Sequence, residues 1–192
     1  MALRVKTVWF KNAGGRSAAE VATVLASTIW RLADITVSNL SKADCDIVTP
    51  ERGIRILGEV AAFLLHMVDR SVYGRIPDEE RAPLIQSAGK RLAEMVVNNL
   101  REMGIDDGFD YRANFIDMLN RRGEDYATFD CQPDKPGFPI LRYLGLAVRE
   151  LMLESDQPWV IDQIMELQAP EALGTLKKTI DGFYPPARRE AR

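Results

Sequence analysis

The sequence predicts an all-α protein, a single-domain helical bundle of about five long and two or three short helices. Apolar residues recur at the three- and four-residue spacing of amphipathic helices, and capping residues, prolines and glycines stand where those patterns begin and end. No β-hairpin pattern and no alternation of strands with helices interrupts the series, which argues against sheet-based enzyme folds. We expect the helices to pack antiparallel around one core.

The first predicted helix runs from about residue 17 to residue 40. Ser17 is a favourable N-cap, and Val21, Leu25 and Leu32 follow it on one face at helical spacing. Residues 1–16 carry four basic side chains and no acid. We expect them to form an extended arm, with a short strand or a helical turn as alternatives.

The second and third predicted helices have the clearest end signals. Thr49 is suited to the N-cap position and Pro50 to the first helical position of the second helix, which we expect to end near Gly74. The third helix is predicted over residues 77–103, with Gly104 closing its C-terminus.

The remaining predicted helices span about residues 109–122, 138–154, 156–168 and 170–182. Residues 123–139, with three prolines and two glycines, are expected to be irregular, and irregular segments of this length are often functional or mobile. The helical domain is predicted to span residues 1–184, followed by a disordered tail over residues 185–192.

Charge and composition give no reason to expect nucleic acid or a membrane as a partner. The net charge is −3, whereas nucleic-acid-binding domains are usually basic. The longest apolar run, residues 60–65, is far shorter than the ~20 residues that span a bilayer. Cys45 and Cys131 are expected to be free thiols in a reducing cytoplasm, because a domain of this size needs no disulfide.

The segment 49–73 carries a polar stripe and the only histidine of the chain. At about 100° per residue, Glu59 and His66 lie two turns apart on one side of the predicted helix, with Asp69 and Tyr73 beyond them. The opposite side of the helix is apolar.

Three interpretations of this stripe are open. We favour the solvated or interfacial face of an amphipathic helix, where Glu59 pairs with Arg55, and His66 lies beside Arg70 and Asp69 as ordinary surface neighbours. Alternatively, Glu59, His66, Asp69 and Tyr73 are candidate ligands for iron, manganese or zinc, completed by acids from other helices. The Glu-x-x-His pair of di-iron bundles is absent, so the resemblance to ferritin-like proteins is a fold-level analogy only. In the third interpretation, His66 is a general base oriented by a carboxylate.

No complete catalytic set is recognisable in the sequence. A phosphate-binding glycine loop, a nucleophile elbow and a zinc-binding spacing of cysteines and histidines are all missing. We therefore assign no catalytic residue and expect no cofactor outside the metal alternative. Whether the protein is an enzyme stays open, with a non-enzymatic role favoured.

The leading functional prediction is a non-enzymatic cytoplasmic protein that acts through protein–protein contacts as a homodimer. Four aromatic side chains stand off the main apolar faces, where they are candidates to contact a protein partner: Trp9, Phe10, Trp30 and Phe63. One alternative is the metal-binding bundle, with oxidoreductase activity among its functions. Another is a small-molecule-binding bundle with a pocket under residues 123–139.

Overall fold

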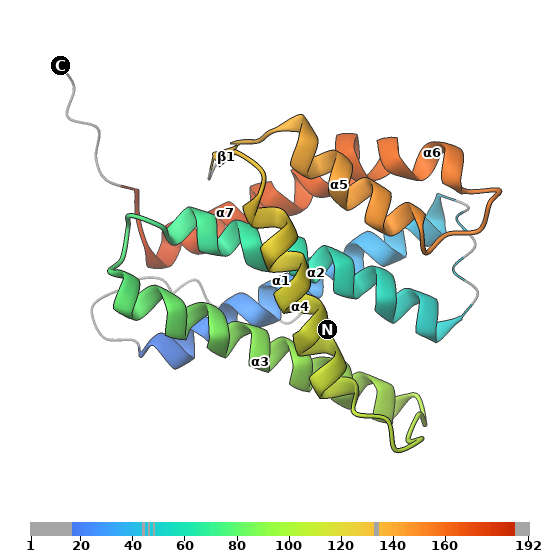
Figure 1. The fold of residues 1–192 in the computed structure, drawn as a ribbon, viewed down its shortest axis with the longest axis horizontal. Helices are drawn as coiled ribbons and strands as arrows, with labels where there is room; N and C mark the ends of the chain where they lie inside the picture. Colours follow the sequence, from blue (N-terminus) through green and yellow to red (C-terminus); the bar gives the residue numbers. More distant parts are fainter. Residues whose placement is uncertain (1–16, 44, 46, 48, 133–134, 187–192) are drawn as a thin grey trace, which may run out of the picture.

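The computed structural model describes residues 17–43, 45, 47, 49–132 and 135–186. Its elements in chain order are α1 (Ala18–Lys42), α2 (Pro50–Val72), α3 (Asp78–Glu102), α4 (Tyr111–Ala127), β1 (Cys131–Gln132), β2 (Lys135–Pro136), α5 (Phe138–Arg149), α6 (Gln157–Asp162), the π-helix η2 (Gln163–Gln168) and α7 (Ala169–Phe183). The prediction of an all-α helical fold is confirmed (Figure 1). The predicted arm over residues 1–16, with Trp9 and Phe10, and residues 187–192 of the predicted tail lie outside the described residues.

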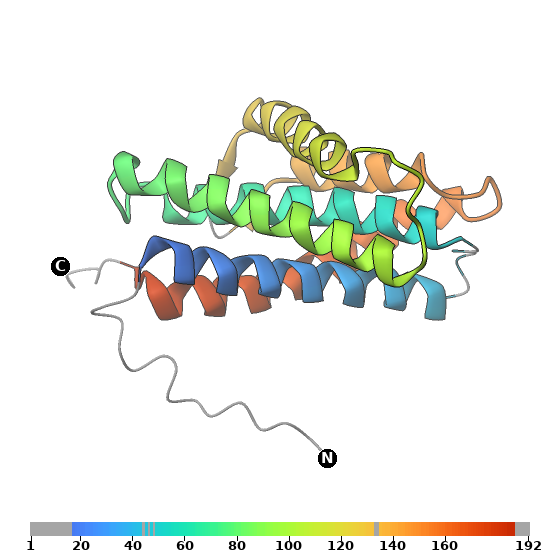
Figure 2. The ribbon, with the colours of Figure 1, turned by 90° about the horizontal axis from the view of Figure 1, so that it is seen from below.

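The helices are arranged in layers around α2. Figure 2 shows α1 and α7 side by side in one layer, α2 and α3 in the next, and α4 crossing over the outer side of these two. Helix α2 contacts α1, α3, α4, α5 and α7, so it is the central helix of the fold. Any polar residue on α2 therefore lies close to the core.

The caps predicted for α1 and α2 are present. Ser17 and Glu20 form a reciprocal capping box at the start of α1. The Thr49 side chain accepts a hydrogen bond from the Arg52 backbone N–H, and Pro50 is the first residue of α2. At the ends of α2 and α3, Gly74 and Gly104 have φ values of 73° and 78°, which residues with a side chain rarely adopt.

Helix α4 is longer than predicted, because it continues to Ala127 instead of ending near residue 122. Tyr126, in its last turn, is fully buried, and its ring lies 5.7 Å from that of Phe63 on α2. The packing of this aromatic side chain stabilises a last turn that apolar periodicity alone did not reveal.

The segment 123–139 is less irregular than expected, because its first residues, to Ala127, belong to α4. After α4 it forms a small antiparallel hairpin, in which Cys131 pairs with Pro136 and Gln132 with Lys135. The expectation that the chain contains no β-hairpin was therefore wrong in this one place. Helix α5 then ends at Arg149 and not at residue 154.

The C-terminal helices run on from one another, whereas the sequence predicted a break at Pro170. The π-helix η2 joins α6 directly to α7, and Pro170 lies in the first turn of α7. Proline removes one backbone donor and crowds the carbonyl four residues earlier, and the wider π turn accommodates both effects.

Helix α1 is long and apolar enough to span a membrane by length and composition, and it is the one such helix among the described residues. Half of its most apolar window is buried inside the fold, as in a core helix. It packs against α2, α3 and α7.

Candidate functional site

Glu59 and His66 of the polar stripe of α2 are buried, so the interpretation of this part of the stripe as a solvated face was wrong. Glu59 is 8% exposed and His66 is 9% exposed. Helix α4 packs against this side of α2, with Arg122 bonded to Glu59 and the Tyr126 ring against His66. These two residues, which the periodicity placed opposite the core, therefore belong to a second buried face.

Glu59 is one half of a buried ion pair with Arg122 of α4. The Arg122 Nε and Nη2 atoms donate to the two Glu59 carboxylate oxygens at 2.6 and 2.8 Å. Arg122 Nη1 donates to the Tyr143 hydroxyl at 2.6 Å, and that hydroxyl donates to Asp125. The hydrogen bond to Glu59 raises the pKa of Arg122 further above its ordinary value.

This network joins α2, α4 and α5 and satisfies its own donors and acceptors. A two-pronged arginine–carboxylate pair is the strong form of a buried ion pair, because each charge is solvated by the other. Glu59 therefore has a structural partner, and His66 is not part of that network. No cluster of three or more histidine, cysteine or acidic side chains suited to a metal occurs among the described residues.

His66 lies instead in a pocket of about 720 Å³, here called the three-helix pocket. It is lined by residues of α2, α3 and α4 and by residues 129–131, which lead into β1. Gly123, Phe129 and Cys131 place it beside the segment 123–139, where the sequence suggested a pocket. Its apolar lining includes Ala62, Leu65, Ile85, Ile116 and Leu119.

The His66 ring packs against the Tyr126 ring, with 5.5 Å between the ring centroids. Its Nε2 atom is buried and has no hydrogen-bond partner among the residues described. Burial lowers the pKa of His66 below its ordinary value, Asp69 opposes this shift, and Arg70 adds to it. The lowered pKa favours the neutral imidazole, whose Nε2 atom donates or accepts one hydrogen bond depending on the tautomer.

Arg70 lines the same pocket one turn further along α2. Its Nη2 donates weakly to the Cys131 carbonyl oxygen at 3.5 Å, and its guanidinium lies 5.5 Å from the centre of the Tyr73 ring. The Nε atom of Arg70 is buried and, within the described part of the chain, has no acceptor. Sequence reasoning treated Arg70 only as a surface neighbour of His66 and missed its place in the pocket.

Asp69 and Tyr73 have other roles than the candidate metal ligands. Asp69 forms an ion pair with Arg81 of α3 at 2.7 Å. Tyr73 is 56% exposed beyond the end of α2, and the Arg81 guanidinium lies 5.2 Å from its ring centre. Of the four predicted ligands, His66 and Asp69 line the same pocket, whereas Glu59 belongs to the ion-pair network and Tyr73 lies at the surface.

Cys131 lines the pocket as a protonated thiol. Its Sγ atom is buried 3.6 Å from the Met67 Sδ atom, and burial raises the pKa of the thiol. A thiol with a raised pKa is a weak nucleophile, so the pocket does not contain an activated cysteine. The polar groups of the pocket are suited to binding a molecule through hydrogen bonds.

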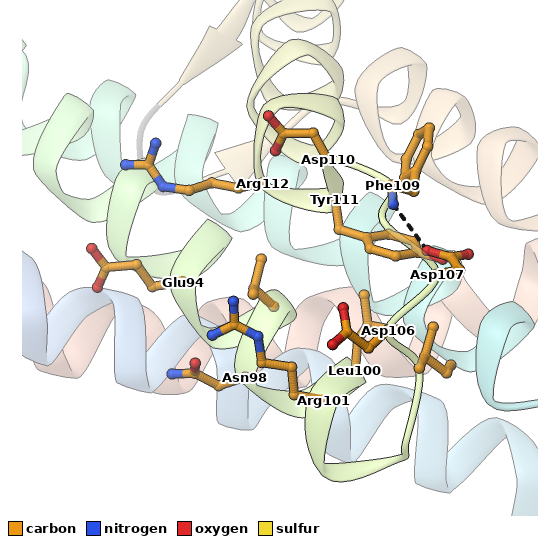
Figure 3. Close-up of a pocket in the computed structure, with 12 residues that line it drawn as sticks. Glu94, Asn98, Leu100, Arg101, Asp106, Asp107, Phe109, Asp110, Tyr111 and Arg112 are labelled. Atoms are coloured by element: carbon orange, nitrogen blue, oxygen red, sulfur yellow. Dashed lines mark hydrogen bonds between the residues drawn. The ribbon is translucent and has the colours of Figure 1, made fainter.

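Two other hollows lie around the turn between α3 and α4. The one in Figure 3, of about 590 Å³, is lined by charged side chains of α3 and the turn, such as Glu94 and Arg101. Asp107 is held there by the Phe109 backbone N–H at 3.1 Å and by the Tyr111 hydroxyl at 2.8 Å. The other hollow, of about 910 Å³, is lined in part by the Glu59–Arg122 network. Neither contains a buried polar side-chain atom without a partner among the described residues, which separates them from the three-helix pocket.

The aromatic candidates for a protein interface are also divided. Phe63 is 0% exposed and packs on Tyr126, so it belongs to the core and does not contact a partner at the surface. Trp30 is half-buried against the core. Trp9 and Phe10 precede the described residues.

Comparison of the chain with models of protein families, with curated proteins and with solved structures gives no match.

Proposed function

We propose that this protein binds a small, largely apolar molecule in the three-helix pocket. The observation that carries the proposal is the His66 side chain, which lines the pocket with a buried Nε2 atom that no described residue satisfies. Buried polar side-chain atoms in native proteins nearly always have a hydrogen-bond partner. A bound molecule supplies one at this position.

The size and lining of the pocket support the same conclusion. Its volume of about 720 Å³ is within the range of roughly 300–1,000 Å³ that is common for small-molecule sites. Leucine and isoleucine side chains from three helices line it, whereas His66 and Arg70 offer a few polar groups near β1. An apolar wall with a few convergent polar groups is the usual composition of such a site.

Fluorescence of N-phenylnaphthylamine, a neutral apolar probe whose emission increases in apolar surroundings, tests the proposal. We expect saturable binding to the full chain and its loss in Gly123→Trp. Gly123 lies on α4 at the pocket, and a side chain added there enters open space. Because a helical glycine is replaced, the substitution removes a helix-destabilising residue while filling the pocket.

Gly174→Trp on α7 is the matched control, because a side chain added at Gly174 also meets open space. It should bind the probe as the unchanged protein does. Probe binding that survives in Gly123→Trp, or that is lost only in Gly174→Trp, would contradict the proposal. Thermal unfolding of both variants checks that they are folded.

The earlier expectation of a cytoplasmic homodimer acting through protein contacts stays a prediction. Analytical ultracentrifugation of the full chain tests its oligomeric part, and a monomer at all concentrations would contradict it. Metal analysis of protein purified without chelator tests the alternative of bound iron, manganese or zinc.

A further inference from the structure

Two polar atoms of the three-helix pocket, His66 Nε2 and Arg70 Nε, are buried without a partner among the described residues and lie one turn apart on α2. Leu65, Gly89 and Leu119 contribute to its apolar part, and a side chain at Gly89 would touch both leucines at 3.5 to 3.6 Å. His66 directly follows Leu65, and Arg70 lies one turn nearer the end of α2, where its Nη2 atom reaches the Cys131 carbonyl oxygen. A molecule in this pocket therefore meets His66 and Arg70, here called the polar end of the pocket, beside an apolar wall.

Arg70 supplies the positive charge at the polar end. A guanidinium carries five N–H donors, and the described contacts of Arg70 use one of them, in a long hydrogen bond of 3.5 Å. Its remaining contact is with the Tyr73 ring, and its Nε atom is buried without an acceptor from the described residues. Arg70 thus offers one donor, Nε–H, that is already removed from water.

The acidic side chains near this end do not accept hydrogen bonds from Arg70 in the described part of the chain. Asp69 forms an ion pair with Arg81 at 2.7 Å, and the Asp69 side chain is 28% exposed. Glu124 and Asp130, which also line the pocket, are exposed at its edge. Neither forms an ion pair with Arg70 in the described structure.

Resting on the proposed function, we propose that the bound molecule carries an anionic group that accepts hydrogen bonds from Arg70 and His66. In the tautomer that carries its proton on Nε2, the neutral imidazole donates through Nε2–H. The Arg70 guanidinium donates through Nε–H and supplies the positive charge. The apolar body of the molecule lies along Leu65 and Leu119. The ligand class is a small amphipathic anion, such as an aromatic or aliphatic carboxylate, sulfonate or phosphate ester.

Two probes that differ by one charged group test this assignment. Anilinonaphthalene sulfonate is N-phenylnaphthylamine with an added sulfonate, so comparing their dissociation constants isolates the effect of the anionic group. In Arg70→Gln we expect the affinity for the sulfonate to fall about tenfold, or about 1.4 kcal/mol. The affinity for the neutral probe should change less than about twofold, since the apolar wall is intact.

Lys90→Gln is the matched control for charge, because Lys90 also lines the pocket but is exposed at its edge. Its effect on sulfonate binding should be below about twofold, since exposed charges are screened by water and salt. Arg70→Lys keeps the charge and removes the Nε donor, so it should lose part of the affinity. Because Arg70→Lys keeps the charge and most of the side chain, it also provides a folded variant for comparison if Arg70→Gln does not fold.

The outcomes separate the two proposals. If both probes bind, Gly123→Trp blocks both, and Arg70→Gln weakens them equally or not at all, the anionic assignment is overturned while the small-molecule pocket stands. If Lys90→Gln weakens sulfonate binding as much as Arg70→Gln does, general surface charge is responsible and the assignment is also overturned. If neither probe binds the folded protein, both proposals fail.

Discussion

Replacing Glu59 by glutamine should destabilise the protein by about 2–3 kcal/mol. Glu59 accepts two hydrogen bonds from Arg122, and the two side chains are 11% and 23% exposed. Glutamine keeps one oxygen but turns an NH₂ group toward the guanidinium, which loses its counter-charge. Removing one member of a fully buried pair costs about 3–5 kcal/mol. Partial exposure, and the contacts that Arg122 keeps with Tyr143 and Asp125, reduce the expected cost.

A double-mutant cycle with Arg122→Met measures how much of this cost belongs to the pair. Arg122→Met leaves a buried carboxylate without its counter-ion, so it should cost at least as much as Glu59→Gln. The double variant should cost less than the sum of the two, with a coupling of about 2 kcal/mol. Urea denaturation followed by circular dichroism gives all the free energies of unfolding. A cost below about 1 kcal/mol for Glu59→Gln, or additive single effects, would refute the role assigned to the ion pair.

Three further predictions concern buried positions. The single histidine signal in a proton NMR titration should give a pKa for His66 below 6.5. The free energy of unfolding should therefore be unaffected by this residue above about pH 6.5 and should fall at lower pH, where the unfolded chain binds a proton that the folded chain does not. A pKa at or above 6.5 would contradict this. Gly145→Ala should lower the free energy of unfolding by about 1–3 kcal/mol, because the added carbon would lie 3.0 Å from an Ile161 side-chain atom. Gly174→Ala, where the added carbon meets open space, should raise it by about 0.5–1 kcal/mol. Equal thermal unfolding temperatures for the two variants would contradict the packing argument. Tyr126→Phe should be neutral or stabilising in urea denaturation, since its buried hydroxyl has no partner among the described residues; a loss above about 1 kcal/mol would indicate a hydrogen bond that this reasoning lacks.

The helix boundaries that the sequence predicted well are those set by local chemistry. Ser17, Thr49 and Pro50 act within a few residues of themselves, through hydrogen bonds or a fixed φ angle, so their roles can be read without knowing the fold. The same holds for Gly104, whose positive φ closes α3 whatever packs against it. The starts of α1 and α2 and the end of α3 therefore followed from the sequence, and the all-α class followed from the series of helices.

What the sequence did not reveal depends on contacts between distant segments. Periodicity assigns one apolar face to α2, but α4 also packs against Glu59 and His66 of the polar stripe, and nothing in the α2 sequence indicates which helix lies there. The ion partner of Glu59 lies 63 residues away. The extension of α4 to Ala127 likewise depends on Tyr126 reaching Phe63 on another helix. One signal was present: a lone histidine and an acid within a strongly apolar helix are costly to bury, and so mark positions where a partner must be sought.

His66 and Glu59 lie on the same buried side of α2, and their different surroundings lead to a last prediction. Glu59 has its counter-ion within the fold, whereas His66 Nε2 has no partner among the described residues. An unsatisfied buried group lowers stability, so His66→Leu, which replaces it with an apolar side chain of similar size, should leave the free energy of unfolding unchanged or higher.

The same variant should lose affinity for anilinonaphthalene sulfonate while it still binds N-phenylnaphthylamine. Stability and ligand affinity would then respond in opposite directions to one substitution, which is expected where a polar group serves a ligand and not the fold. Urea denaturation and probe titration of the same preparation measure both. If His66→Leu is destabilised by more than about 1 kcal/mol and binds the sulfonate as before, the histidine serves the core instead, because its removal then costs stability and not affinity.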